Sequence, residues 1–121
     1  DLKNLNNKYN SEKEMISKSI TQLNNNIFFW GAGHQALAYL SMIGSNKNIK
    51  VIDSAIFKQG NFCPGSGYKI HDPKILEEVD NGELIISCGG YNKEVLKIAK
   101  HLIKGDFNFY DIVNGELRRI E

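Results

Sequence analysis

The chain has 121 residues, of which 41% are hydrophobic, and its 15 Lys and Arg side chains nearly balance its 14 Asp and Glu side chains. This length and apolar content suit one domain with one core, and the balanced charge excludes the one-sided basic surface of a nucleic-acid-binding module. The longest apolar run, residues 27–33, is too short to span a bilayer, and the polar segment before it contains no signal-peptide core. We therefore expect no membrane contact and a cytoplasmic location.

The two cysteines, Cys63 and Cys88, lie far apart in the sequence. Neither a C-x-x-C pair nor a histidine at zinc-ligand spacing accompanies them, so the sequence predicts no metal site. Their spacing gives no support for a disulfide, and two free thiols in a reducing compartment are the favoured interpretation.

The N-terminal segment is predicted to be a polar tail followed by a helix. Residues 1–10 are rich in Asn and Lys, which is typical of a tail or linker. The Ser11-x-x-Glu14 pattern is a capping box, and the apolar residues behind it recur at helical spacing. The pattern predicts a helix over residues 11–23, so we expect one domain over residues 11–121.

Two strands with a helix between them are predicted next. Residues 27–30 are a continuous apolar run, as in a strand buried on both faces of a parallel sheet. A Gly-Ala-Gly turn follows at once, and a helix is predicted over residues 34–43, ending at Gly44. Residues 49–53 form the second predicted strand.

The second half of the chain begins with an irregular loop over residues 54–68, and loops of this length are often functional. A very short strand is predicted at residues 68–70, and Asp72-Pro73 begins a short helix. A buried strand over residues 84–86 leads into a second glycine turn. The clearest amphipathic helix of the chain, residues 95–103, and a last strand over residues 107–113 complete the predicted elements.

Alternating strands and helices predict parallel strands joined by right-handed crossovers. The expected fold is a compact Rossmann-like, doubly wound α/β domain, with a mostly parallel sheet of about four to five strands flanked by helices.

The first glycine turn is the strongest candidate for a binding site. Residues 31–36, G-A-G-H-Q-A, fit G-x-G-x-x-A between a predicted strand and a helix, and Asp53 ends the next strand. Gly31 permits the tight turn, Gly33 lets a ligand approach the backbone, and the helix N-terminus offers N–H groups to a phosphate. Three interpretations stay open: a bare turn, a site for a nucleotide-like phosphate or sugar, and a true dinucleotide site.

The second glycine turn, residues 88–91, is expected at the same C-terminal edge of the sheet, where ligands bind in open α/β sheets. The predicted substrate-binding residues share this edge: they are Gly31, Gly33, His34, Gln35, Asp53, Lys58, Gly60, Gly90 and Tyr91. For each of them a structural role is the alternative. Cys88 and His34 are the only conceivable nucleophile and base, and no motif supports them, so we predict no catalytic residue.

Two segments resemble a known family. Residues 30–37, W-G-A-G-H-Q-A-L, and residues 51–60, V-I-D-S-A-I-F-K-Q-G, resemble the C-terminal domain of SAM-dependent sugar C-methyltransferases. The pattern of that family continues with a Pro-containing turn, which Pro64 supplies here, and with S-Y-x-x-E, which residues 90–94 partly match. The chain departs from the pattern at Ile56, where the family has Pro, and at Cys63 and Gly67, where it often has Thr-type residues.

This resemblance, which covers most of the chain, implies a place in a larger enzyme with a zinc-binding module and a SAM-binding domain before it. The chain would be an accessory domain that helps to form the cleft for a nucleotide-linked sugar or related glycan precursor. SAM is expected in the missing domain and no cofactor in this one, which is not expected to be catalytic alone. The alternatives are a stand-alone NAD-binding module, or small oxidoreductase, and a purely structural domain.

Overall fold

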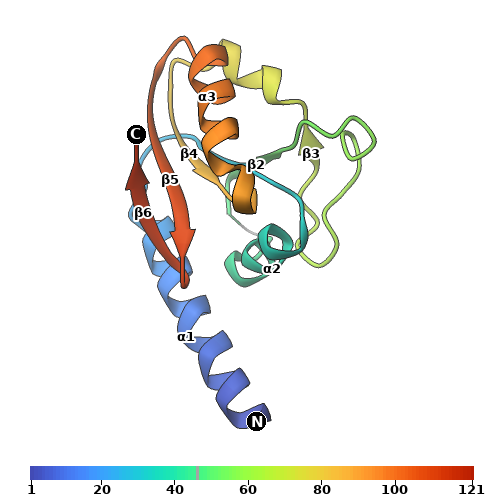
Figure 1. Ribbon diagram of the computed structural model, residues 1–121, viewed down its shortest axis with the longest axis vertical. Helices are drawn as coiled ribbons and strands as arrows, with labels where there is room; N and C mark the ends of the chain where they lie inside the picture. The colour runs from blue at the N-terminus through green and yellow to red at the C-terminus, as the bar shows by residue number, and fades with distance from the viewer. Residues whose placement is uncertain (46) are drawn as a thin grey trace.

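The computed structural model describes residues 1–45 and 47–121 (Figure 1). In chain order the elements are α1 (Leu2–Thr21), β1 (Ile27–Trp30), α2 (His34–Ile43), β2 (Ile49–Ile52), β3 (Ile70–His71), the 3-10 helix η1 (Pro73–Glu78), β4 (Asn81–Ile86), the 3-10 helix η2 (Gly89–Tyr91), α3 (Asn92–Leu102), β5 (Asp106–Val113) and β6 (Glu116–Ile120).

The strands form one six-stranded sheet in the order β3-β2-β1-β4-β5-β6. Neighbouring strands from β3 to β5 are parallel, and only β6 runs antiparallel, against β5. The predicted mostly parallel α/β architecture is therefore confirmed, and it is compatible with a Rossmann-like fold. The expected strand number of four to five was too low.

The strand that the sequence analysis missed is β6. It follows β5 through a two-residue turn, Asn114-Gly115, in which both residues have positive φ (52° and 81°). Asn-Gly is the strongest short-range signal for such a hairpin. The sequence of β6, E-L-R-R-I, has few apolar residues because much of this edge strand is exposed, so it lacks the apolar run that marks the inner strands.

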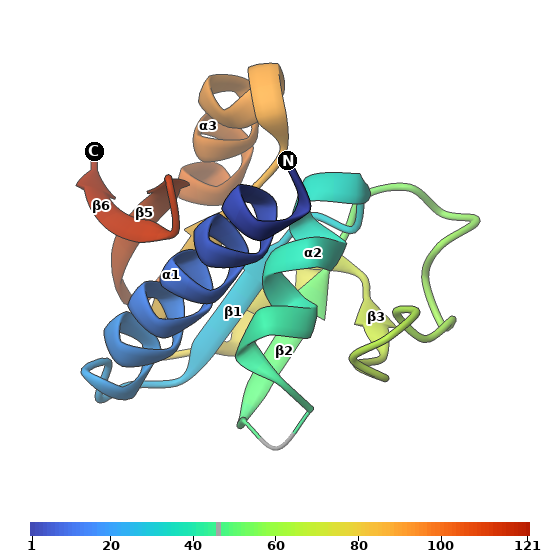
Figure 2. The same ribbon diagram turned by 90° about the horizontal axis from the view of Figure 1, so that it is seen from below.

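Helices cover both faces of the sheet, which places the core in two layers (Figure 2). One layer packs Phe29 and Val51 against α1 and α2. The other packs Trp30 and Ile52 against η1 and α3. Strand β1 lies at the centre, where Phe29 pairs with Val51 of β2 and Ile85 of β4, and all three side chains are fully buried. Burial on both faces explains why β1 is a continuous apolar run.

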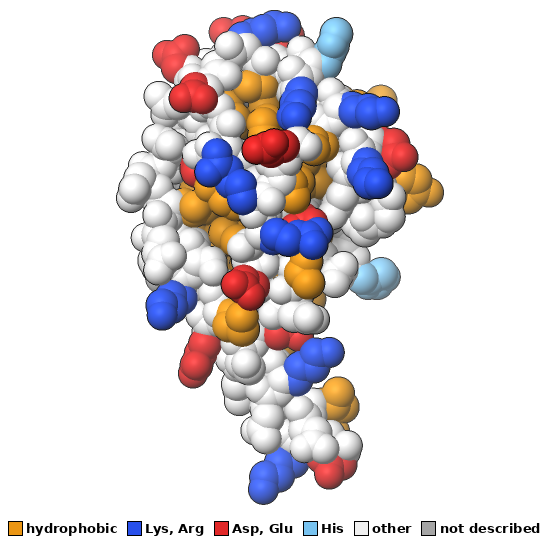
Figure 3. Space-filling view, turned by 60° about the vertical axis from the view of Figure 1, so that its left-hand side comes forward, with side chains coloured by type: hydrophobic (Ala, Val, Ile, Leu, Met, Phe, Trp, Pro, Cys, Tyr) orange, Lys and Arg blue, Asp and Glu red, His pale blue; other side chains and the backbone are white. Residues whose placement is uncertain are grey.

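Helix α1 begins at Leu2 rather than at Ser11, so residues 2–10, expected to be a tail or linker, are helical. The N-cap is Asp1, whose side chain accepts a hydrogen bond from the Asn4 amide at 2.9 Å. The Ser11-x-x-Glu14 pattern lies inside the helix and is not its start. The first eleven residues are exposed, and Figure 3 shows this part of α1 projecting from the body.

Other boundaries differ by a few residues. The short strand predicted at residues 68–70 is Ile70–His71, and the helix predicted over residues 95–103 is Asn92–Leu102. The predicted helix after Asp72 is a 3-10 helix, whose N-cap is Asp72 as expected. Among the residues that the structure describes, no helix has the length and apolarity that crossing a membrane requires.

A buried carboxylate in the sheet gives a first testable prediction. Glu83 is 4% exposed and accepts hydrogen bonds from Tyr110 Oη at 2.8 Å and Asn108 Nδ2 at 3.0 Å. Burial, and after it this contact, raises the pKa of Tyr110 to about 12. Because folding then favours the protonated phenol, the stability it contributes is present below pH 10 and is lost as the pH rises to about 12.

We expect the tyrosinate absorbance of the wild type minus that of Tyr110→Phe to titrate with a pKa of about 12. Glu83→Gln should move this midpoint downward, because the neutral amide no longer opposes formation of the phenolate. A difference titration centred at the ordinary tyrosine pKa of 10.0 would contradict the burial and the contact.

Candidate functional site

A cleft of about 530 Å³ opens at the C-terminal ends of β1, β2 and β4. Strand β1 has β2 on one side and β4 on the other, so the strand order changes direction at this point of the sheet. Ligands of open α/β sheets bind at such a switch point. The lining residues come from the two glycine turns, the start of α2, the end of β2 and the loop behind it, and α3. They are Trp30, Gly31, Ala32, Gly33, His34, Gln35, Ala36, Asp53, Ser54, Lys58, Ser87, Cys88, Gly89, Tyr91 and Val95.

The first glycine turn is held between two strands. The Gly31 N–H donates to the Ile52 carbonyl at 2.9 Å, and the Ser87 N–H donates to the Trp30 carbonyl at 2.9 Å. Gly31 has a φ of 137°, and a Cβ at this position would lie 2.3 Å from the Ser87 carbonyl oxygen. The turn therefore requires glycine here for its conformation and for the close approach of the β4 end.

Gly33 has a different role. It is the N-cap of α2 with ordinary negative φ, and a Cβ would meet no atom within 4 Å. The first bond inside the helix runs from the Leu37 N–H to the Gly33 carbonyl at 2.9 Å, so the N–H groups of His34, Gln35 and Ala36 have no partner within α2. All three residues line the cleft, which offers these donors to a ligand.

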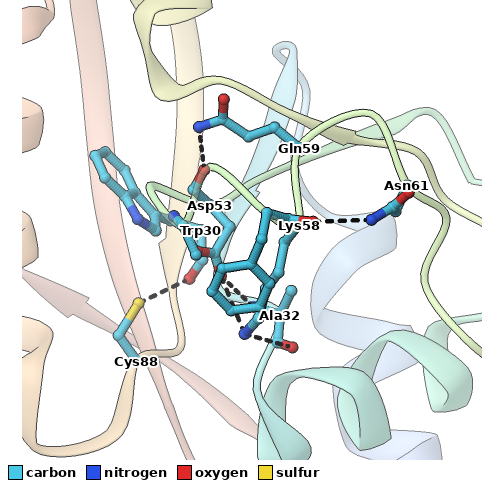
Figure 4. A network of polar contacts seen from close by, with 9 residues as sticks. Trp30, Ala32, Asp53, Lys58, Gln59, Asn61 and Cys88 are labelled. Atoms are coloured by element: carbon cyan, nitrogen blue, oxygen red, sulfur yellow. Dashed lines mark hydrogen bonds and ion pairs between the residues drawn. The ribbon is translucent and has the colours of Figure 1, made fainter.

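Asp53 links the first glycine turn to the loop that follows β2 (Figure 4). Its Oδ2 accepts from the Ala32 N–H at 3.0 Å, and its Oδ1 accepts from the Ala55 N–H at 2.8 Å. Lys58 reaches back to the same turn, with its Nζ 3.4 Å from the Ala32 carbonyl oxygen and 3.9 Å from Asp53 Oδ2. The side chains of Asp53 and Lys58 are 15% and 32% exposed, so both still face the cleft.

The loop behind Asp53 is bonded back onto the strand that precedes it. Gln59 Nε2 donates to the Asp53 carbonyl at 2.9 Å, and Asn61 Nδ2 donates to the Phe57 carbonyl at 2.9 Å. From the D-S-A-I-F-K-Q-G block, Asp53, Ser54 and Lys58 line the cleft. Ile56 and Phe57 are 83% and 78% exposed at the outside of this loop.

Seven of the nine predicted substrate-binding residues line this cleft: they are Gly31, Gly33, His34, Gln35, Asp53, Lys58 and Tyr91. Gly60 and Gly90 are not among its lining residues. The Gly60 N–H instead donates to the Ile70 carbonyl at 2.8 Å, with a φ of 85° that shapes the loop. Gly90 lies within η2. Ser54, Ser87 and Gly89 were missed, although each directly flanks a predicted strand end or glycine, which is the signal that could have found them.

Cys88 lines the cleft, and its side chain stays a protonated thiol at neutral pH. Its Sγ donates to the Trp30 carbonyl at 3.3 Å, and burial, with a smaller effect of Asp53, raises its pKa to about 11. A thiol with this pKa is a poor nucleophile at neutral pH because little thiolate forms. Within residues 1–45 and 47–121, no three His, Cys, Asp or Glu side chains gather in a way that could hold a metal ion.

The Cys88 environment gives a second prediction. At pH 7, alkylation of Cys88 by iodoacetamide should be about tenfold slower in the folded chain than in the denatured chain, because burial raises its pKa and leaves less thiolate. Peptide-resolved mass spectrometry of a quenched time course would follow Cys88 and Cys63 separately. Equal rates at Cys88 in folded and denatured protein would contradict the placement of its sulfur.

The fold and the site define an α/β domain with an open cleft at the carboxyl edge of a mostly parallel sheet. Comparison with known proteins adds no relative to this description. No protein-family model matches the chain, and no curated protein or solved structure matches it significantly.

Proposed function

We propose that this chain is a Rossmann-like, doubly wound accessory domain of a cytoplasmic SAM-dependent methyltransferase, the C-terminal one of that enzyme. In this proposal its cleft holds part of a nucleotide-linked sugar or related glycan precursor, and a neighbouring domain binds SAM and transfers the methyl group. The observation that carries the proposal is the bonding of the loop over residues 53–60, which brings Asp53, Ser54 and Lys58 to the cleft. A bare β-α turn does not need a loop whose acid, lysine and glutamine are all bonded to the turn or to the strand end.

The chemistry of the cleft supports a binding role over a catalytic one. Its acid, Asp53, is engaged by two backbone N–H groups, and its thiol has a pKa of about 11. The thiol is a poor nucleophile near neutral pH, and the carboxylate holds the turn and the loop together. Both suit a rigid surface against which a substrate is positioned while another domain supplies the reaction.

An NAD-binding module is the second candidate, because the strand order is the one found in dinucleotide-binding folds. Against it, the Ala32 N–H of the turn that would face the diphosphate of a dinucleotide already donates to Asp53 Oδ2. The Asp53 carboxylate would then lie beside that diphosphate.

Isothermal titration calorimetry of the chain tests the proposal. We expect binding of UDP-glucose or dTDP-glucose, and no heat from SAM or NAD at the same concentrations. Binding of NAD alone would replace the proposal with the dinucleotide module, and binding of SAM would place the methyl donor in this domain.

A further inference from the structure

The glycine turn in this cleft is already occupied by a carboxylate of the chain itself. In a phosphate-binding turn, the backbone N–H groups that follow the first glycine point at the ligand and remain free for its oxygens. Here the Ala32 N–H donates to Asp53 Oδ2 at 3.0 Å, and the Gly31 N–H donates to the Ile52 carbonyl. A phosphate placed against these two residues would find no free donor and would face the Asp53 carboxylate.

The charge of the cleft also disfavours a diphosphate. Its lining residues include one carboxylate, Asp53, and one lysine, Lys58, besides His34, and the Lys58 ammonium lies 3.9 Å from the carboxylate. No second lysine or arginine lines the cleft among the residues described. A diphosphate brings at least two negative charges, and near the turn it would meet the Asp53 carboxylate, so that only Lys58 and the N–H groups at the start of α2 would oppose its charge.

The same groups suit a neutral ligand that carries hydroxyl groups. Asp53 is 15% exposed and keeps acceptor capacity beyond its two backbone donors, and the Lys58 ammonium has donors to spare. An acceptor and a donor side by side match the alternating donor and acceptor character of sugar hydroxyls. Tyr91, 73% exposed, also lines the cleft, and an aromatic ring can pack against the C–H side of a sugar ring.

We propose that the sugar ring, and not the diphosphate, of the nucleotide-linked substrate occupies the glycine-turn cleft, with hydroxyl groups donating to Asp53 and accepting from Lys58. Asp53 is thereby a specificity-determining residue that admits a neutral polyhydroxyl group and repels phosphate from the turn. The inference rests on the proposed function for the identity of the ligand, and on the geometry around Asp53 for its orientation.

The test compares each nucleotide sugar with its own nucleotide, using the chain and its Asp53→Asn variant. UDP-glucose is paired with UDP, and dTDP-glucose with dTDP, in parallel calorimetric titrations. We expect the wild type to bind at least one nucleotide sugar tenfold or more tightly than the matching nucleotide. Asp53→Asn should erase most of this ratio, because the amide cannot accept from Ala32 and from a hydroxyl as the carboxylate does.

Two further variants keep the result interpretable. Asp106→Asn removes an exposed carboxylate at the opposite edge of the sheet and should leave both affinities unchanged. Lys58→Met provides an independent change if Asp53→Asn does not fold. Lys58 is partly exposed, and its ammonium contacts the Ala32 carbonyl and Asp53 only at 3.4 and 3.9 Å, so we expect this variant to fold. It should also lower the ratio of sugar-nucleotide to nucleotide affinity.

The outcomes separate the inference from the proposed function. Equal affinity of the wild type for the nucleotide and for its sugar nucleotide would mean that the sugar ring gains no contact in this cleft. That result overturns the inference and leaves the proposed function standing. No binding of either nucleotide sugar to the wild type would overturn both.

Discussion

Replacing Gly31 by alanine is expected to destabilise the fold by about 3 kcal/mol or more, through two effects that act together. The φ of 137° is a conformation that side chains rarely adopt, and the new Cβ would lie 2.3 Å from the Ser87 carbonyl oxygen. The Cβ position is fixed by the backbone at residue 31 and the Ser87 carbonyl is itself backbone, so neither group can rotate away. Equilibrium urea unfolding of Gly31→Ala and wild type measures the change.

Gly33→Ala is the matched control, because it makes the same substitution two residues later in the same turn. A Cβ there meets nothing within 4 Å and φ is negative, so only the N-cap preference for glycine over alanine is lost. We expect a cost of less than about 1 kcal/mol. Equal costs for the two variants would show that the turn is not pressed against the end of β4.

Phe29→Ala is expected to destabilise the chain by about 3–5 kcal/mol, the usual cost of truncating a fully buried aromatic side chain. Phe29 is 0% exposed in the central strand β1, where it packs in the layer formed with α1 and α2. Its removal leaves a cavity between the sheet and two helices. The same urea titration, followed by far-ultraviolet circular dichroism, gives the free energy of unfolding.

Phe57→Ala makes the same chemical change on the surface. Phe57 is 78% exposed, and its ring lies 5.8 Å from the Lys58 ammonium, so its removal should cost less than about 1 kcal/mol. A large cost at Phe57, or a small one at Phe29, would contradict the burial assigned to β1 and to the loop.

The inner part of the fold could be predicted because its signals are local. Continuous apolar runs mark β1 and the end of β4, since these segments are buried on both faces, and β2 is apolar except at the exposed Lys50. The glycine turn and Asp53 follow two of these runs directly, so their meeting at one edge of a parallel sheet follows from the strand direction alone. The periphery gave weaker signals. The edge strand β6 is largely polar, and the Asn-rich start of α1 resembles a tail although Leu2, Leu5 and Tyr9 continue its helical spacing.

The internal bonding of the site lay beyond sequence reasoning. The sequence places Asp53 at a strand end, but which amide its carboxylate accepts depends on how β2 and the turn after β1 align across 21 residues. The sequence predicts different roles for the two glycines of the turn: Gly31 permits the tight turn, and Gly33 lets a ligand approach the backbone. In the structure one of them is pressed against β4 and the other opens into the cleft. Nothing in the sequence distinguishes Gly60 from these two glycines, yet in the structure Gly60 lies in the loop outside the cleft.

An amide-shift titration of the chain with a nucleotide-diphosphate sugar, the bare nucleotide, NAD and SAM tests the central claim most directly. The account predicts that the nucleotide sugar shifts the amides of residues 31–35 and 53–58, around the cleft, and that SAM shifts none. Shifts in the same residues with NAD alone, or silence from all four ligands, would contradict the claim that this cleft holds a sugar substrate.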